Sequence, residues 1–230
     1  MMRGVHSPLL AVLATLLAVG ACSGGSEPQD KRSKGEEACA TVLGDKAMNW
    51  LQTRVAEPEF SDPTSISNAR DWFRGQVKDY RPGDLPNYVT SQMCEVKDGS
   101  EGALGGTQVE LRYGVSSYPF DYEFTKQRDV GDRTTAIDAG PDVKLVYWPD
   151  GTSRNRFEYH VYVKCGVPNS HETSLNEVPL EGTLKDNLTG DPSHRTHLTH
   201  LLHSAKVMTD GFGCTNNPRI PTTVPTSVKD

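Results

Sequence analysis

The sequence predicts an α+β domain in which an open antiparallel sheet of about four to six strands carries the N- and C-terminal helices on one face. Apolar and polar residues alternate in several middle segments, which is typical of strands with one buried face. Segments near both ends of the domain repeat apolar residues at helical spacing. The chain has five cysteines, four of which follow residue 38 and can form two disulfides.

The first 21 residues have the pattern of a signal peptide. Arg3 is followed by the uncharged apolar run PLLAVLATLLAVG, residues 8–20. This run is too short for a membrane-spanning helix, which needs about 20 apolar residues, but it suits the core of a signal peptide. It ends in Val19-Gly20-Ala21-Cys22, which looks like a bacterial lipobox. The sequence therefore predicts cleavage before Cys22 and attachment of diacylglycerol to the Cys22 sulfur.

Lipidation of Cys22 would hold the protein on the extracytoplasmic face of the cell membrane. Each buried methylene of an acyl chain contributes about 0.8 kcal/mol, so two long chains anchor a protein durably. Residues 22–37 are then the lipidated cysteine and a flexible tether of small and charged residues. The alternative interpretation is an ordinary secretory signal with a chance cysteine at its end.

The rest of the chain is expected to form one domain, residues 38–214, followed by an extended tail rich in proline and threonine, residues 215–230. The whole chain has a formal net charge of −6. Cleavage before Cys22 removes only Arg3 among the charged residues and leaves a net charge of −7. This charge argues against nucleic acid as a general partner, because phosphate backbones bind basic surfaces.

Two helices are expected in the first part of the domain. Residues 38–57 repeat apolar residues at helical spacing, and Asp45 can cap a helix that restarts after Gly44. A second helix with one apolar face is expected over residues 67–80, and the following Pro-Gly-Asp ends it.

Strands are expected in the middle of the chain. The segment TQVELRYGV, residues 107–115, alternates apolar and polar side chains. Residues 143–148 and 156–165 flank a Pro-Asp-Gly turn signal, so they predict a hairpin. Weaker patterns indicate a strand around Cys94 and an edge strand near residues 178–184.

The cysteines other than Cys22 are an even set, which predicts two disulfides in an oxidising compartment. These four residues are Cys39, Cys94, Cys165 and Cys214. Three connectivities are possible, and we favour Cys39–Cys94 with Cys165–Cys214, because each pair ties a helix end to a strand in its own half of the chain. The set has no C-x-x-C spacing, which argues against a metal cluster.

The segment SHRTHLTHLLHSAKVM, residues 193–208, predicts a helix that Ser193 caps and that carries histidines every third residue. The four histidines are His194, His197, His200 and His203. They wind around the helix, so all four cannot bind one ion. A neighbouring pair among His197, His200 and His203 could hold zinc or another transition metal with a further ligand that the sequence does not name. The alternatives are a pH-responsive face and a plain solvated helix face.

The run YPFDYEF, residues 118–124, alternates aromatic residues with other residues. Phe120, Tyr122 and Phe124 are candidates for a stacking platform that binds a sugar or a peptide. The alternative is a strand whose aromatic face closes the core.

Catalytic motifs are not evident in the sequence. His171-Glu172 begins like the zinc-protease motif H-E-x-x-H, but Leu175 stands where the second histidine is needed. The chain has no G-x-S-x-G elbow, phosphate loop or dinucleotide fingerprint. We therefore expect a protein that is not an enzyme and has no cofactor, and we keep a hydrolase with an unfamiliar site as the weaker alternative.

Both ends of the chain carry a family resemblance. The segments ACSGG, Ala38-Cys39 and LLHSAKVMTDGFGCTNNPRIP resemble those of small exported lipoproteins of actinobacteria, of the streptomycete type. In that family a terminal helix runs into Gly-Cys and then a proline-containing tail. The resemblance covers the two ends and, in the middle, only the order of the elements. It implies an extracytoplasmic location and disulfides, and it assigns no catalytic or binding residue.

The sequence thus favours a lipid-anchored, non-enzymatic module of the cell envelope that binds a protein, a peptide or a small ligand. The alternative is a metal-binding or pH-responsive lipoprotein that uses the helix face of His197, His200 and His203.

Overall fold

The computed structural model describes residues 32–81, 88–100, 108–126, 133–150, 156–167 and 178–230. The predicted signal peptide, Cys22 and His171 lie outside these residues. The elements in chain order are α1 (Lys34–Arg54), β1 (Pro58–Phe60), α2 (Ile66–Val77), β2 (Ser91–Asp98), β3 (Gln108–Val115), the short 3₁₀ helix η1 (Phe124–Lys126), β4 (Thr135–Asp138), β5 (Val143–Pro149), β6 (Phe157–Lys164), β7 (Pro179–Asp186) and α3 (His194–Phe212). None of the described helices is long and apolar enough to cross a membrane.

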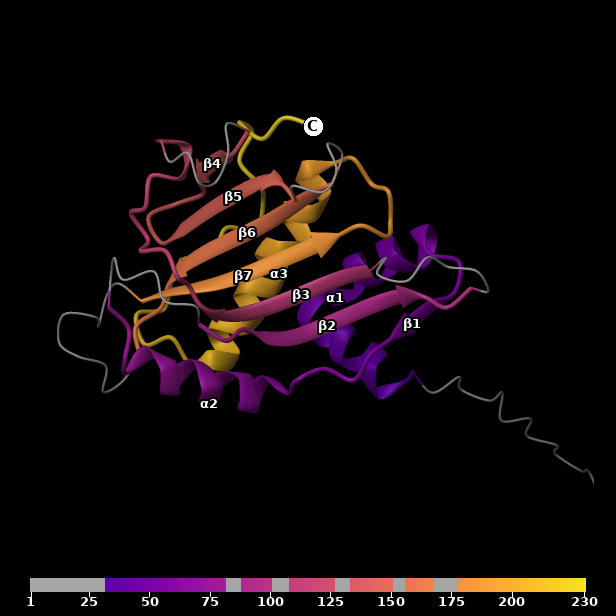
Figure 1. The fold of residues 1–230 in the computed structure, drawn as a ribbon, viewed down its shortest axis with the longest axis horizontal. Helices are drawn as coiled ribbons and strands as arrows, with labels where there is room; N and C mark the ends of the chain where they lie inside the picture. Colours follow the sequence, from indigo (N-terminus) through magenta and orange to yellow (C-terminus); the bar gives the residue numbers. More distant parts are fainter. Residues whose placement is uncertain (1–31, 82–87, 101–107, 127–132, 151–155, 168–177) are drawn as a thin grey trace, which may run out of the picture. The chain divides into compact units, whose positions relative to one another are not determined.

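The seven described strands form one antiparallel sheet in the order β1-β2-β3-β7-β6-β5-β4. Figure 1 shows α1 and α3 together behind this sheet and α2 along its lower edge. The predicted α+β class is therefore confirmed, with N- and C-terminal helices on one face. The sheet has more strands than the predicted four to six, because β1 and β4 are too short, at three and four residues, to give an alternating pattern.

Strand β7 corrects one expectation. The weak pattern at residues 178–184 predicted an edge strand, but β7 pairs with β3 on one side and β6 on the other. Leu184, for example, lies opposite Leu111 of β3 and Tyr159 of β6. The predicted hairpin of β5 and β6 is confirmed by their antiparallel register, in which Pro149 lies opposite Phe157.

The main core lies between the sheet and the helices. The predicted inward residues of β3 are all buried, and so is the apolar stripe of α3. The α3 stripe consists of Leu198, Leu201, Leu202, Ala205, Met208 and Phe212. At the centre, the Tyr113 hydroxyl lies 2.7 Å from Ser204 Oγ of α3. Gly182 of β7 leaves room for the Tyr113 ring, because a Cβ at that position would lie 2.4 Å from Tyr113 Cζ.

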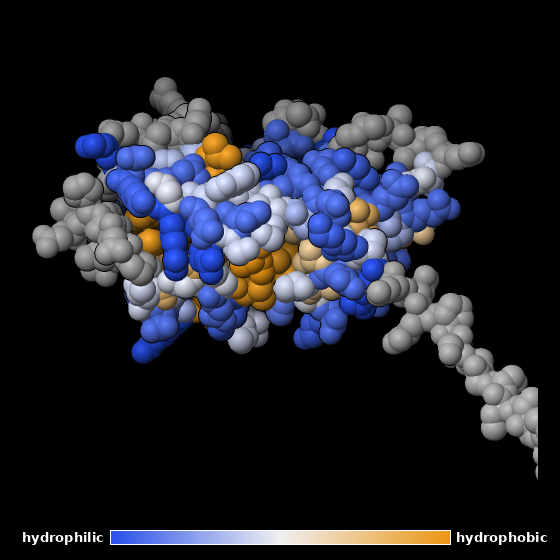
Figure 2. Space-filling view, turned by 90° about the horizontal axis from the view of Figure 1, so that it is seen from below, coloured by the Kyte–Doolittle hydropathy of each residue, from blue (hydrophilic) through white to orange (hydrophobic). Residues whose placement is uncertain are grey.

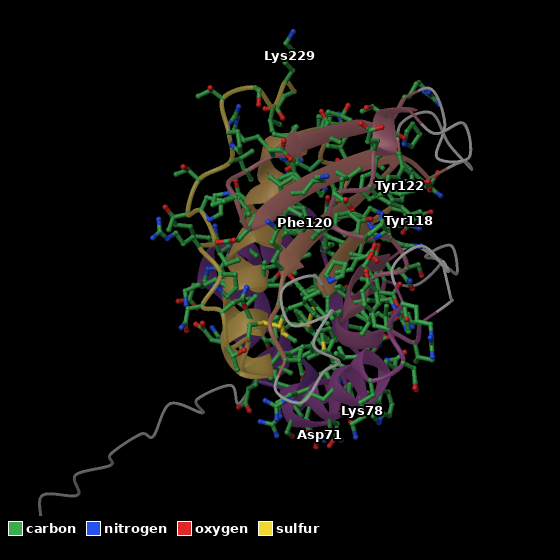
Figure 3. All side chains as sticks on the ribbon, turned by 90° about the vertical axis from the view of Figure 1, so that its left-hand side faces the viewer. Asp71, Lys78, Tyr118, Phe120, Tyr122 and Lys229 are labelled. Atoms are coloured by element: carbon green, nitrogen blue, oxygen red, sulfur yellow. A yellow bond between two sulfur atoms is a disulfide. The ribbon has the colours of Figure 1, made fainter. Side chains whose placement is uncertain are left out.

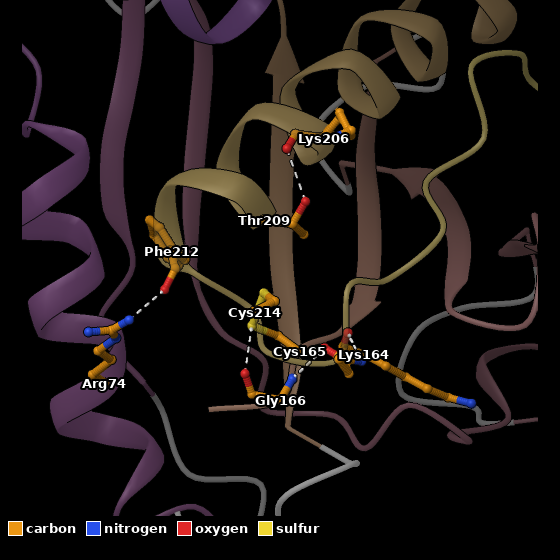
Figure 4. The surroundings of a disulfide bond; sticks show 9 residues. Arg74, Lys164, Cys165, Gly166, Lys206, Thr209, Phe212 and Cys214 are labelled. Atoms are coloured by element: carbon orange, nitrogen blue, oxygen red, sulfur yellow. Dashed lines mark hydrogen bonds between the residues drawn. A yellow bond between two sulfur atoms is a disulfide. The ribbon is translucent and has the colours of Figure 1, made fainter. Parts of the chain in front are cut away.

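The two favoured disulfides are present. Cys39–Cys94 joins α1 to β2, and Cys165–Cys214 joins the end of β6 to the end of α3. In both pairs the Cα atoms are 4.9 Å apart, well within the usual range for a disulfide. Figure 4 shows the second disulfide below the last turn of α3, where Arg74 of α2 donates a hydrogen bond to the Phe212 carbonyl.

Helix α1 begins inside the predicted tether and is interrupted where the sequence predicts a restart. The Ser33 side chain caps it by accepting a hydrogen bond from the Glu36 amide at 3.1 Å. At Gly44 the backbone adopts φ 77° and ψ 166°, which is not helical. This conformation is open almost only to glycine. It lets Asp45 start the second part of the helix, as predicted.

We expect Gly44→Ala to lower the free energy of unfolding by about 1–3 kcal/mol, the usual cost of a non-glycine residue in such a conformation. A Cβ at Gly44 would also lie 2.5 Å from His203 Nε2. Urea unfolding monitored by circular dichroism measures the change. Gly75→Ala in α2 is the matched control, because a Cβ there meets nothing within 4 Å, and it should leave stability equal or raise it by up to about 1 kcal/mol. Equal effects of the two substitutions would contradict the role of Gly44.

The C-terminal tail has no helix or strand, as expected, but it packs against the domain. Val224 and Val228 are buried, with 7 % and 3 % of their surfaces exposed. The Arg195 guanidinium of α3 donates hydrogen bonds to both of their carbonyl oxygens, at 3.3 and 2.8 Å. Asp230 accepts from the Arg195 amide at 2.8 Å, beside the N-terminus of α3. The tail therefore covers part of α3.

Candidate functional site

His197 lies in the core and not on the solvated helix face that we expected. Only 1 % of its surface is exposed. Its Nδ1 lies 2.7 Å from the Ser193 carbonyl oxygen, and its Nε2 lies 2.8 Å from Asp186 Oδ2. The ring stacks on Tyr159 with the centroids 4.4 Å apart. Because both ring nitrogens lie at hydrogen-bond distance from oxygen atoms, neither is open to a metal ion in this arrangement.

Asp186, at the end of β7, is buried with His197, and each side chain is 2 % exposed. Burial alone would raise the pKa of Asp186, but hydrogen bonds from His197 and Thr189 outweigh it and hold the pKa below its usual value. The carboxylate also accepts from the backbone amides of Leu188 and Thr189. Asp186 therefore fixes both His197 and the turn that leads from β7 toward α3.

His194 faces a different region, among aromatic side chains of the sheet. Its ring stacks on Tyr147 with the centroids 4.4 Å apart, and its Nδ1 lies 3.0 Å from the Tyr159 hydroxyl. Burial is the main cause that lowers the pKa of His194. It lines an open pocket of about 620 Å³ together with Asp186 and Asp191. The carboxylate of Asp191 is already bound by the Trp50 indole at 2.9 Å.

A pocket of about 400 Å³ lies between the interruption of α1, helix α3 and the C-terminal tail, and we call it the His200 pocket. It is lined by Leu43, Gly44, Asp45 and Lys46 of α1, by Thr199, His200, Leu202, His203 and Lys206 of α3, and by Ile220, Pro221 and Thr222 of the tail. The three walls come from parts of the chain that are far apart in sequence. The pocket therefore forms only because the tail packs against α3 and because the backbone turns at Gly44.

His200 is the unusual group of this pocket. Its surface is 7 % exposed, and its buried Nε2 has no hydrogen-bond partner among the described residues. Burial, followed by the nearby His197, lowers the pKa of His200 to about 4, so the ring is neutral at pH 7. The ring packs at 4.9 Å from that of Trp50. A buried polar atom without a partner costs about 1–3 kcal/mol, so a polar group that reached Nε2 would stabilise the folded state.

The predicted metal-binding face is only partly brought together. His200 and His203 line the same pocket, whereas His197 is held by Asp186 on another side of the helix. Within the described ranges, no group of three or more histidine, cysteine, aspartate or glutamate side chains could hold a metal ion. A pair of ligands from His200 and His203 stays a hypothesis.

We expect the wild-type protein to lose about 3 kcal/mol more stability than His200→Gln between pH 7 and pH 4. The unfolded histidine takes up its proton near pH 6.5, whereas folded His200 does so only near pH 4. Protonation therefore favours the unfolded state as the pH falls through this window, by about 1.4 kcal/mol per pH unit of difference. Urea titrations of both proteins at several pH values measure the effect. His203→Gln, which changes an exposed residue of the same pocket, is the control and should keep most of the loss that the wild type shows, because burial of His200 is its main cause. Parallel pH profiles of wild type and His200→Gln would contradict the burial of His200.

The aromatic run at residues 118–124 is not a strand. It forms bends and leads into η1, and its rings gather in a second apolar cluster on the sheet face opposite the helices. Figure 3 shows Tyr118 and Tyr122 close together, with Phe120 apart from them. Phe124 is 1 % exposed, and its ring lies 4.9 Å from that of Tyr162 of β6. The cluster therefore covers part of the sheet and does not close the main core.

Phe120 and Tyr122 are partly exposed and line a shallow pocket of about 550 Å³. The ammonium groups of Lys144 and Lys164 lie 5.4 and 4.7 Å from the centroid of the Phe120 ring. These cation–π contacts occupy the ring of Phe120, which is one of the three candidates for stacking. Binding of a sugar or a peptide by Phe120, Tyr122 and Phe124 stays a prediction.

The sequence reasoning missed a charged cluster around His160 of β6. Its ring stacks on Trp148 at 3.9 Å, its Nδ1 lies 2.8 Å from Glu181 Oε1, and its Nε2 lies 3.5 Å from Glu158 Oε2. Burial lowers the pKa of His160, but the two carboxylates outweigh it and raise the pKa above its usual value. Burial likewise opposes ionisation of Glu158, yet hydrogen bonds from His160 and Lys185 lower its pKa to about 2. The alternation of β6 could have indicated this cluster, because it places the His160 side chain on the sheet face away from the main core.

Comparisons with known proteins name no family for this chain. We found no family model, curated protein or solved structure that matches it. The resemblance to actinobacterial lipoproteins therefore stays a prediction, and functional proposals depend on the residues of the chain itself.

Proposed function

We propose that the protein is a lipid-anchored module on the extracytoplasmic face of the cell membrane that binds a small ligand in the His200 pocket and does not act as an enzyme. The signal peptide pattern, the lipobox at Cys22 and the two disulfides support the location, since disulfides persist mainly in oxidising compartments. The buried, unpaired Nε2 of His200 is the observation that carries the binding function.

The chemistry of the pocket favours a ligand with an apolar body and one polar end. Leu43, Leu202 and Ile220 supply apolar surface, and the neutral His200 ring can exchange one hydrogen bond with a polar group. Lys46 also lines the pocket and favours a negative charge on that end. Small monocarboxylates fit this description, and a pocket of about 400 Å³ is within the usual range for small molecules.

A thermal melt of the full-length lipoprotein in detergent tests binding, with benzoate and aliphatic monocarboxylates as probes. A ligand at a hundredfold excess over its Kd stabilises the folded state by about 2.7 kcal/mol. We expect a saturable rise in Tm that is lost in His200→Phe and kept in Thr223→Ala, which changes an exposed residue of the tail. No rise with any probe, or an equal rise in both variants, would reject the His200 pocket as the binding site.

A metal-binding or pH-responsive role is the second candidate, and the shared pocket of His200 and His203 favours it. The same melt with zinc, nickel or copper and with EDTA separates the two candidates. A metal-dependent rise in Tm that disappears in both His200→Gln and His203→Gln would support a two-histidine site. A rise that survives both substitutions would place the metal elsewhere.

The location is tested separately by replacing Cys22. We expect the wild type in the membrane fraction, with diacylglycerol on its N-terminal peptide by mass spectrometry, and Cys22→Ser in the soluble fraction. A wild-type protein whose N-terminal peptide carries no lipid would reject the anchor.

A further inference from the structure

Two large apolar side chains are exposed in the described part of the chain, Trp72 of α2 at 53 % and Val89 at 62 %. Gln76, one helical turn after Trp72, joins the Val89 backbone to α2. Its side chain exchanges two hydrogen bonds with the Val89 backbone, accepting from the amide at 2.7 Å and donating to the carbonyl at 2.9 Å. Its Nε2 also lies 3.4 Å from the Trp72 carbonyl oxygen. Val89 therefore lies beside α2 about one helical turn from Trp72, and we call these two exposed side chains the patch of Trp72 and Val89.

Trp72 also lines a groove of about 520 Å³ between α1 and α2, which we call the α1–α2 groove. Its apolar surface comes from Ala38 and Val42 of α1, Ile66 of α2 and Met93 of β2. Figure 2 views the molecule from the side of α2 and shows apolar residues gathered in the middle of that face. Apolar surface gathered in a groove is available for contact with a protein or a membrane.

The groove lies near the N-terminal end of the domain, and this position indicates whether it contacts a protein or a membrane. Lys34, the first residue of α1, lines the groove together with Trp72. Cys22 precedes Arg32, the first described residue, by only ten residues. A chain of this length spans at most about 35 Å when fully extended. An anchor at Cys22 would therefore keep the groove end of the domain close to the bilayer.

We propose that the α1–α2 groove and the patch of Trp72 and Val89 dock on the outer surface of the membrane, with Trp72 at the lipid–water interface. This inference rests on the proposed lipidation of Cys22. Tryptophan favours that interface because its ring is largely apolar and its indole N–H finds a polar partner. The net charge of −7 after cleavage opposes attraction to anionic lipids, so apolar contact carries the docking. Docking would fix the orientation of the domain on its anchor.

The test uses the full-length lipoprotein reconstituted in phosphatidylcholine vesicles with and without lipids brominated near the headgroup. Bromine quenches tryptophan only at close range. The chain has three tryptophans, and Trp50, at 8 % exposure, is buried. We expect brominated lipid to reduce the emission of the wild type, in low and in high salt, and to have little effect on Trp72→Phe. We expect Val89→Glu to lose most of the quenching and Thr223→Glu, with the same change of charge on the exposed tail, to keep it.

Equal emission with and without bromine in vesicle-bound wild type would overturn the docking and point to a protein partner for the groove. Quenching that is unchanged in Trp72→Phe would overturn it as well. Flotation of the vesicles separates this failure from a failure of the proposed anchor. Wild type that floats without quenching contradicts only the docking, whereas wild type that does not float contradicts the lipid anchor on which the docking depends.

Discussion

Replacing both cysteines of the second disulfide, as Cys165→Ala with Cys214→Ala, is expected to lower the free energy of unfolding by about 4 kcal/mol. The disulfide joins residues 49 positions apart and restricts the unfolded chain, and the loss follows from the loop entropy of that cross-link. Equilibrium unfolding in urea measures it, and 4 kcal/mol is a large share of the 5–15 kcal/mol that is usual for a domain.

We expect the hydrogen bonds around the second disulfide to remain in the double variant, so that the loss of stability reports the cross-link alone. The Asn216 side chain accepts from the Gly166 amide at 2.8 Å and donates to the Lys164 carbonyl at 3.0 Å. The Thr215 amide donates to the Gly166 carbonyl at 2.8 Å. The matched comparison is Cys39→Ala with Cys94→Ala, whose separation of 55 residues predicts a loss of similar size. A loss below about 1 kcal/mol in either pair would contradict the entropic account.

The features that the sequence predicted correctly depend on short-range patterns. The alternation in β3, β5 and β6, the apolar stripe of α3 and its cap at Ser193 are all set by neighbours within a few residues. The two disulfides followed from the placement of cysteines at the ends of such elements. These features could be predicted because local geometry decides them.

The central place of β7 could not be predicted in the same way. A strand shows in its own sequence which face is buried, but not which strands it pairs with. β7 follows β6 in the chain and pairs with it, but its other neighbour is β3, which comes much earlier in the chain, so its central position depends on a distant contact. The packing of the C-terminal tail could not be predicted for the same reason, because Arg195 binds carbonyl groups about 30 residues away.

The histidines of α3 show how this limit affects a candidate site. Spacing along the helix placed His197 and His200 on a polar face, because only threonine and serine neighbours were visible in the sequence. In the fold, α3 is covered by the sheet, by α1 and by the tail, so positions outside the apolar stripe are buried too. Asp186 and Trp50 supply the partners that make this burial possible. Neither residue is marked as a partner by anything in the sequence.

Removing the partner of His197 is the other change for which we expect a large effect. Asp186→Ala should lower the free energy of unfolding by about 3–5 kcal/mol, the usual result of breaking a buried pair from one side. His197 would keep its bond to the Ser193 carbonyl but lose the acceptor at Nε2, in a place that water does not reach. Urea unfolding at pH 7 measures the loss.

A double-mutant cycle with His197→Ala isolates the pair from the other bonds of Asp186. Asp186→Ala also removes the acceptor for the amides of Leu188 and Thr189, so part of its effect is independent of His197. If the pair is coupled, the double variant should lose at least about 1 kcal/mol less than the sum of the single losses. Additive losses would show that Asp186 stabilises mainly the turn after β7. In that case His197 would be held chiefly by the Tyr159 ring and by the Ser193 carbonyl.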